Sequence, residues 1–137
     1  MHQVPGRPLW VGHSGDTRDP RVMLNAGIGA VVELADSEPM ASLPRDLVRC
    51  RFPLADGSGN PAWLLRVAAE TIARLLRAGV PTLVCCGSGM SRSVCLAAAG
   101  LSLADHRPLC ETLAAVAAAG PADVSPALLA DLQNTLG

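Results

Sequence analysis

The chain has 137 residues, of which 50% are hydrophobic and 17% are charged. This balance is typical of a compact folded domain and argues against disorder. Eleven arginines, with no lysine, and twelve acidic residues give a net charge of −1, so no charged tract indicates a nucleic acid or a membrane surface as partner.

The first half of the chain predicts short strands separated by one helix and by loops. Asp19-Pro20 predicts a helix start, because an N-cap residue is followed by Pro at the first helical position. Gly27 ends that helix, and residues 35–46 form a loop rich in Pro and Ser. Apolar runs or alternation predict three strands: residues 8–12, 28–34 and 47–53.

The second half predicts a long amphipathic helix, a short strand and a cluster of smaller helices. The long helix begins at Asn60-Pro61 after the turn-rich loop 55–61, and it ends at Gly79. A strand is predicted at residues 82–85. The remaining helices are predicted at residues 92–104, 108–119 and 126–135. Strands that alternate with helices predict a single α/β domain over residues 1–137, with a four- or five-stranded, mainly parallel sheet flanked by helices.

Nothing in the sequence indicates export, membrane insertion or a structural metal. No run approaches about 18 uncharged apolar residues, and the first ten residues lack the apolar core of a signal peptide, so we expect a cytoplasmic protein. An odd number of cysteines, five, without a CxxC pair is a poor disulfide framework and a poor zinc site.

The segment TLVCCGSGMSRS, residues 82–93, joins a buried strand, a glycine-containing loop and a helix start. A helix N-terminus binds anions through unpaired N–H groups and the positive end of its dipole, and loop amides can form a nest around the same point. Gly87 and Gly89 let the backbone approach closely, and Arg92 offers a planar fork of donors for phosphate oxygens. These surroundings favour a thiolate at the front of the loop, so Cys86 is the predicted nucleophile.

The pattern C-x5-R-S in residues 86–93 resembles the CxxGxxRS signature loop of the dual-specificity phosphatases, within the protein tyrosine phosphatase superfamily. The order of the surrounding segments is also similar to that family. These segments are VVELAD (31–36), RFPLADGSGNP (51–61) and the long helix that follows. The resemblance extends from about Leu9 to about Leu132 and implies a phosphatase that hydrolyses phosphate monoesters.

The resemblance also implies a role for each site residue. Cys86 attacks phosphorus and forms a phosphocysteine, Arg92 clamps two phosphate oxygens, and Ser93 helps the thiolate leave in the second step. Asp56 protonates the leaving oxygen and then activates water. The phosphate-binding loop residues are Gly87, Ser88, Gly89, Met90, Ser91 and Arg92. No metal or other cofactor is implied, and the partner is a phosphorylated protein or a small phosphate ester.

Several assignments have alternatives. The family usually has His immediately before the nucleophile, whereas this chain has Cys85, which could change the rate and pH optimum or act as an oxidation partner. Asp36 is the competing general acid. Asp56 could instead cap a turn before Gly57, and Ser93 could be a solvated helix residue.

Other functions with an anion-binding loop fit the sequence less well. Rhodanese-type sulfurtransferases usually have a shorter loop, and low-molecular-weight phosphatases and arsenate reductases carry C-x5-R near the N-terminus. A nucleotide-binding phosphate loop needs a lysine, which this chain lacks. The alternative from another class is a phosphate-binding module with the phosphatase fold and little turnover.

The substrate is less well determined than the reaction. Pockets specific for phosphotyrosine use an aromatic wall, and this chain has no Tyr and one Phe, which predicts a shallow, permissive pocket. The variable loop positions carry no basic residue, which argues against a polyphosphoinositide. These positions are Gly87, Ser88, Met90 and Ser91.

Overall fold

The computed structural model describes residues 1–35 and 46–136. Within these residues, five strands form one sheet in the order β1-β2-β5-β3-β4. They are β1 (His2–Gln3), β2 (Leu9–His13), β3 (Ala30–Glu33), β4 (Val48–Arg51) and β5 (Thr82–Cys86). β1 runs antiparallel to β2, and the other neighbouring pairs are parallel. The predicted α/β fold with a mainly parallel sheet is therefore confirmed.

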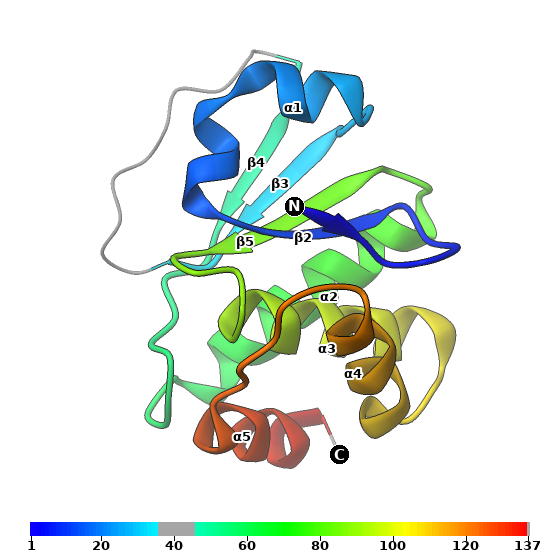
Figure 1. Cartoon of the computed structure of the whole chain (residues 1–137). Helices are drawn as coiled ribbons and strands as arrows, with labels where there is room; N and C mark the ends of the chain where they lie inside the picture. The colour runs from blue at the N-terminus through cyan, green and yellow to red at the C-terminus, as the bar shows by residue number, and fades with distance from the viewer. Residues whose placement is uncertain (36–45, 137) are drawn as a thin grey trace.

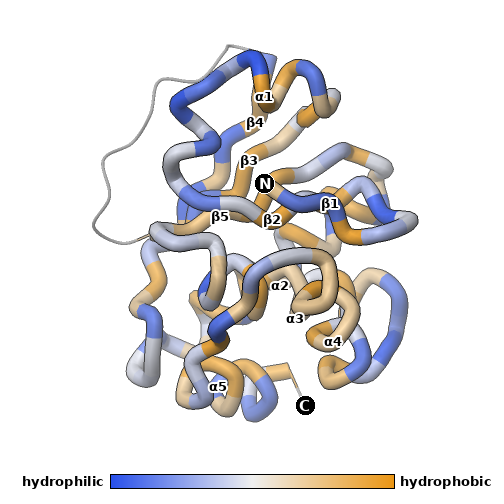
Figure 2. The backbone as a smooth tube through the Cα atoms, viewed as in Figure 1, coloured by the Kyte–Doolittle hydropathy of each residue, from blue (hydrophilic) through white to orange (hydrophobic). Residues whose placement is uncertain are grey.

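The helices cover the two faces of the sheet unequally (Figure 1). The 3₁₀ helix η1 (Ser14–Arg18) and α1 (Pro20–Asn25) lie on one face. On the opposite side, α2 (Ala62–Arg77) and α3 (Arg92–Asp105) pack against the sheet, and α4 (Leu109–Ala118) and α5 (Pro126–Leu136) pack against these two helices. Figure 2 shows that β3 and β5 are strongly hydrophobic in the centre of the molecule, between these two layers.

Alternate residues of β5 pack in two separate apolar clusters, because successive side chains of a strand point to opposite faces of the sheet. Val84 and Cys86 belong to the large cluster under α2 and α3. Leu83 and Cys85 belong to the small cluster with Met23 of α1. The two adjacent cysteines therefore lie on opposite faces of the sheet.

Close packing of α2 on α3 determines where the N-terminus of α3 lies. A Cβ added at Gly100 of α3 would lie 2.3 Å from Cγ2 of Ile72 in α2, so only glycine allows the helices to approach this closely. Residues 93–101 of α3 are all buried. This packing holds α3 under the sheet, with its first residue close to the end of β5.

Local signals predicted most helix ends correctly. Asp19 caps α1 by accepting from the Arg21 N–H, and Ser125 caps α5 by accepting from the Leu128 N–H at 3.3 Å. The α2 prediction needs a correction at its start, because its N-cap is Pro61 and the side chain of the preceding Asn60 bonds to a loop instead.

Other features of the fold differ from the sequence predictions. The two-residue strand β1 and the helix η1 were not predicted, and β5 includes Cys86 as its last residue. Val48 lies on the edge strand β4 and is 54% exposed, although it is an apolar residue of the predicted strand 47–53. Most of the predicted loop 35–46 lies outside the described residues.

The described residues contain neither a membrane-spanning helix nor a cluster of metal ligands. No helix in residues 1–35 and 46–136 is long and apolar enough to cross a membrane. In the same ranges, no group of three or more His, Cys, Asp or Glu side chains is arranged to hold a metal ion.

Candidate active site

Cys86 is the last residue of the central strand β5, at the edge where β2, β3 and β5 all end. This is the carboxyl edge of the parallel strands, where open α/β sheets bind ligands. The Cys86 residue is only 1% exposed. Its neighbour across the sheet is His13, the last residue of β2.

Within the part of the chain that the structure describes, two groups bond to the Cys86 sulfur. The Gly89 N–H donates to Sγ at 3.2 Å, and the Ser93 hydroxyl oxygen lies 3.3 Å from Sγ. When the sulfur is a thiol, its S–H donates to Ser93. When it is a thiolate, the Ser93 hydroxyl becomes the donor, so both contacts then stabilise the negative charge.

The loop after Cys86 leads directly into α3, whose first residue is Arg92. The positive end of the dipole of this fourteen-residue helix is therefore directed at the loop. Arg92 Nη1 donates to the Leu54 carbonyl oxygen at 3.0 Å. The guanidinium is thus held between the loop and the segment that follows β4.

The segment after β4 brings Asp56 to the loop. The Asp56 Oδ1 accepts from the Ser91 hydroxyl at 2.5 Å. The Asn60 side chain closes this segment, because its Oδ1 accepts from the Ala55 N–H at 2.8 Å and its Nδ2 donates to the Ala55 carbonyl at 2.9 Å. The structure therefore brings Asp56 together with the loop of residues 86–92.

The glycine at position 89 is required by its surroundings. Its φ is +75°, and an added Cβ would lie 2.8 Å from the carbonyl carbon and oxygen of Gly12. The end of β2 therefore forms one wall of the loop, a contact that the sequence analysis did not anticipate. A pocket of about 160 Å³ lies at this wall, and its lining includes His13, Ser88 and Met90.

We expect Gly89→Ala to destabilise the protein by about 2–4 kcal/mol, combining left-handed backbone strain with overpacking. Gly6→Ala is the matched control, because Gly6 has the same φ of +75° but an added Cβ would meet open space among the described residues. Urea unfolding measures both variants. Equal losses at the two positions would contradict the role assigned to the Gly12 contact.

The other buried cysteines near the loop are held as neutral thiols. Burial, with a smaller effect of the Glu33 carboxylate, raises the pKa of the Cys85 thiol well above its usual range. Burial also raises the pKa of Cys95 to about 12, with smaller effects of Asp56 and Cys86. Because Cys85 lies on the other face of the sheet, the structure argues against it as an oxidation partner of Cys86.

A second carboxylate at the same edge of the sheet belongs to an ion-pair cluster. Glu33, at the end of β3, is 6% exposed. It accepts a hydrogen bond from Arg49 Nε and lies 3.8 Å from Arg51 Nη1. The two arginines of β4 thus compensate the charge of Glu33, and we assign this carboxylate a structural role and not a catalytic one.

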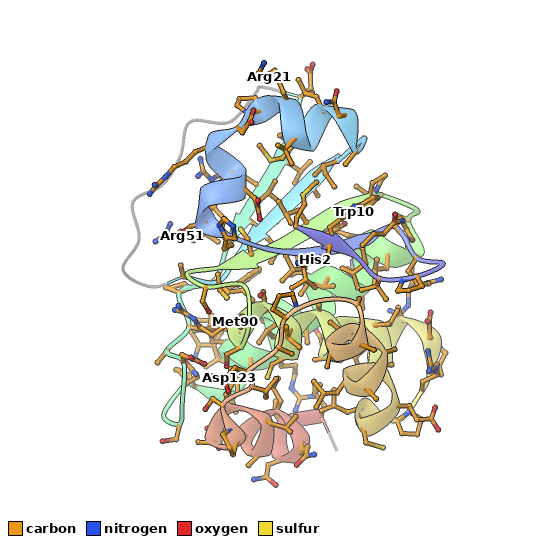
Figure 3. All side chains as sticks on the ribbon, viewed as in Figure 1. His2, Trp10, Arg21, Arg51, Met90 and Asp123 are labelled. Carbon is orange, nitrogen blue, oxygen red and sulfur yellow. The ribbon has the colours of Figure 1, made fainter. Side chains whose placement is uncertain are left out.

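The segment between α4 and α5 also contacts the loop. The Asp123 N–H donates to the Met90 carbonyl at 2.8 Å, and Figure 3 shows the two side chains on neighbouring segments. The Ser125 N–H donates to Ser91 Oγ at 2.9 Å. No local sequence signal announced these contacts, which join residues more than thirty positions apart.

The structure thus brings together the four predicted catalytic residues, Cys86, Arg92, Asp56 and Ser93, around one loop. Ser93 is fully buried, so it is not a solvated helix residue. Asp36, the competing acid, lies outside the described residues.

Comparison with known proteins identifies the fold. No protein-family model and no curated protein sequence matches the chain. Human DUSP28 aligns with a TM-score of 0.87 at 23% identity, over 98% of this chain and 94% of that one. The chain has the dual-specificity phosphatase fold.

Two further solved structures share the dual-specificity phosphatase fold. The human tyrosine phosphatase-like serine/threonine/tyrosine-interacting protein aligns with a TM-score of 0.81 at 17% identity, over 98% of this chain and 93% of that one. OH1 from the Orf virus, a tyrosine phosphatase with triple substrate specificity, aligns with a TM-score of 0.70 at 20% identity, over 97% and 83%. At these identities the likeness establishes the fold.

Proposed function

We propose that this chain is a cysteine-dependent phosphatase that hydrolyses phosphate monoesters through a phosphocysteine intermediate. The contacts of the Cys86 sulfur at the N-terminus of α3 carry this proposal. Its Sγ accepts from the Gly89 N–H at 3.2 Å and lies 3.3 Å from the Ser93 hydroxyl oxygen. A thiolate is stabilised in this position, and a phosphate bound by the same loop places its phosphorus beside the sulfur.

In the first step, the Cys86 thiolate attacks phosphorus. The S–P bond forms as the bond from phosphorus to the ester oxygen breaks. Asp56 gives its proton to the departing oxygen, so the product is a neutral alcohol or phenol. The loop amides of residues 87–92 and the guanidinium of Arg92 bind the other phosphate oxygens and stabilise the charge that develops on them.

In the second step, water attacks the phosphocysteine. The Asp56 carboxylate takes a proton from the water as the new O–P bond forms and the S–P bond breaks. Ser93 donates its hydroxyl hydrogen bond to the departing thiolate. Orthophosphate leaves, and the enzyme returns to its initial state with Cys86 ionised and Asp56 protonated.

The rim of the site supports a permissive choice among phosphorylated proteins and small phosphate esters. Asp56, Ser88 and Met90 are all exposed around the buried Cys86. Small and flexible side chains at such a rim fit leaving groups of different shapes. A cytoplasmic location stays a prediction from the sequence.

A phosphate-binding module with little turnover is the second candidate. One structure with this fold is named as a phosphatase-like interacting protein, and Cys85 stands where the family usually has His. Such a module would keep the amide nest and Arg92 but hydrolyse phosphate esters slowly or stop at the covalent intermediate.

Hydrolysis of p-nitrophenyl phosphate by the unmodified chain distinguishes the two candidates. A phosphatase releases nitrophenol and orthophosphate in large molar excess over the chain, and orthovanadate, a tetrahedral phosphate analogue, competes with the substrate. Release that stops near one equivalent of nitrophenol, or vanadate binding without any release, would favour the binding module.

A further inference from the structure

Ser91 is a buried serine whose hydroxyl bonds to two residues far from it in the chain. It stands at the N-cap of α3 and is 4% exposed. Serine at an N-cap usually bonds to the amides of its own helix. Here the backbone φ of −124° and ψ of −78° turn the residue away from that geometry, and the hydroxyl bonds across the site.

Two contacts give the Ser91 hydroxyl a defined polarity. Its oxygen accepts from the Ser125 N–H at 2.9 Å, and it donates its own proton to Asp56 Oδ1 at 2.5 Å. A backbone N–H can only donate, so this contact occupies a lone pair of the Ser91 hydroxyl oxygen. The single hydroxyl proton is then directed at the carboxyl group.

This arrangement selects between the two oxygens of Asp56. An Oδ1 that accepts from Ser91 keeps the same hydrogen bond in both protonation states of the carboxyl, provided that the proton is carried by Oδ2. Nη1 of the next residue, Arg92, donates a hydrogen bond to the Leu54 carbonyl oxygen at 3.0 Å. Arg92 thus fixes the backbone of the segment that carries Asp56, and Ser91 fixes the orientation of the Asp56 carboxyl group.

We propose that Ser91 is a positioning residue that holds Oδ1 of Asp56, so that Oδ2 delivers the proton to the leaving oxygen and later takes one from water. The inference rests on the proposed function. If Ser91 positions Asp56, the position of the Asp56 carboxyl group also depends on Ser125, and therefore on the segment between α4 and α5.

The test is the leaving-group dependence of Ser91→Ala. We expect kcat to fall by about 10- to 100-fold for an alkyl phosphate, since misplacing an acid loses part of the roughly 10²–10⁴-fold effect of general acid catalysis. p-Nitrophenyl phosphate, whose oxygen needs little protonation, should lose much less. Ser91→Thr keeps a hydroxyl and should recover part of the loss.

A double variant separates positioning from a general loss of structure. With Asp56→Ala already in place, Ser91→Ala should have little further effect on kcat for the alkyl phosphate, because the group that it positions is gone. Ser125→Ala is the matched control. It removes the α5 cap but keeps the backbone N–H to Ser91, so it should lower the urea midpoint without changing the ratio of the two rates.

Each outcome bears on a different claim. Wild-type protein that does not turn over would overturn the proposed function and this inference with it. Two results in a chain that does turn over would overturn the inference alone. One is a loss of kcat in Ser91→Ala that is equal for both substrates, and the other is a loss that is as large in the Asp56→Ala background as in the wild type. Orthovanadate binds through the loop amides and Arg92. A variant that orthovanadate no longer inhibits is therefore one whose loop has not folded.

Discussion

Replacing Cys86 with serine should abolish turnover of p-nitrophenyl phosphate, with a loss on the order of 10³-fold or more. A neutral hydroxyl at this position is a far weaker nucleophile than a thiolate. The loop amides and Arg92 remain, so phosphate binding should persist, and so should the fold. Steady-state hydrolysis and calorimetric binding of phosphate measure the two properties separately.

Cys85→Ser is the control for that experiment. The Cys85 side chain lies in the small cluster on the α1 face, and burial keeps its thiol neutral by raising its pKa. We therefore expect substantial activity in this variant. If Cys85→Ser is inactive and Cys86→Ser is active, the nucleophile has been assigned one residue too late in the chain.

Asp56→Asn should lower turnover by about 10²–10⁴-fold, the range of general acid catalysis, for substrates with poor leaving groups. Phosphoserine, an alkyl phosphate, is such a substrate. The loss should be smaller for p-nitrophenyl phosphate. Asparagine is nearly isosteric and still accepts from the Ser91 hydroxyl, so the variant removes the transferable proton with little change in packing. A plot of rate against leaving-group basicity should become steeper in the variant.

The pH profile gives a second readout of Asp56. The first step needs Cys86 without its proton and Asp56 with its proton in the same molecule, which gives a bell-shaped pH profile. The side-chain amide introduced by Asp56→Asn cannot titrate, so the high-pH limb should flatten in that variant. If Asp36→Asn removes that limb and Asp56→Asn does not, the general acid is Asp36 and the nucleophile assignment is unaffected.

Local signals in the sequence predicted the fold well, because most elements begin and end at residues with strong intrinsic preferences. Asp19 and Ser125 cap their helices as expected. Asn60 shows the limit of such signals, because an amide side chain can cap a helix or close a loop with similar energy. Here it closes the segment that carries Asp56, a choice that depends on tertiary packing.

The contiguous part of the site could be predicted because its geometry is local. A strand, a glycine-containing loop and a helix start within residues 82–93 are sufficient to indicate an anion site. The opposite directions of Cys85 and Cys86 also follow from strand alternation. The contacts of Ser91 with Asp56 and Ser125, and of Gly89 with Gly12, join segments far apart in the chain and emerge only from the folded structure.

Trapping of the covalent intermediate tests the central claim most directly. Wild-type chain is mixed with p-nitrophenyl phosphate, quenched in acid within the first turnovers, digested and examined by mass spectrometry. We predict a phosphoryl group on the peptide that contains Cys86, at Cys86 itself, together with release of many equivalents of orthophosphate in the unquenched reaction. Multiple turnovers with the phosphoryl group on another residue, or a phosphorylated Cys86 that is never hydrolysed, would contradict that mechanism.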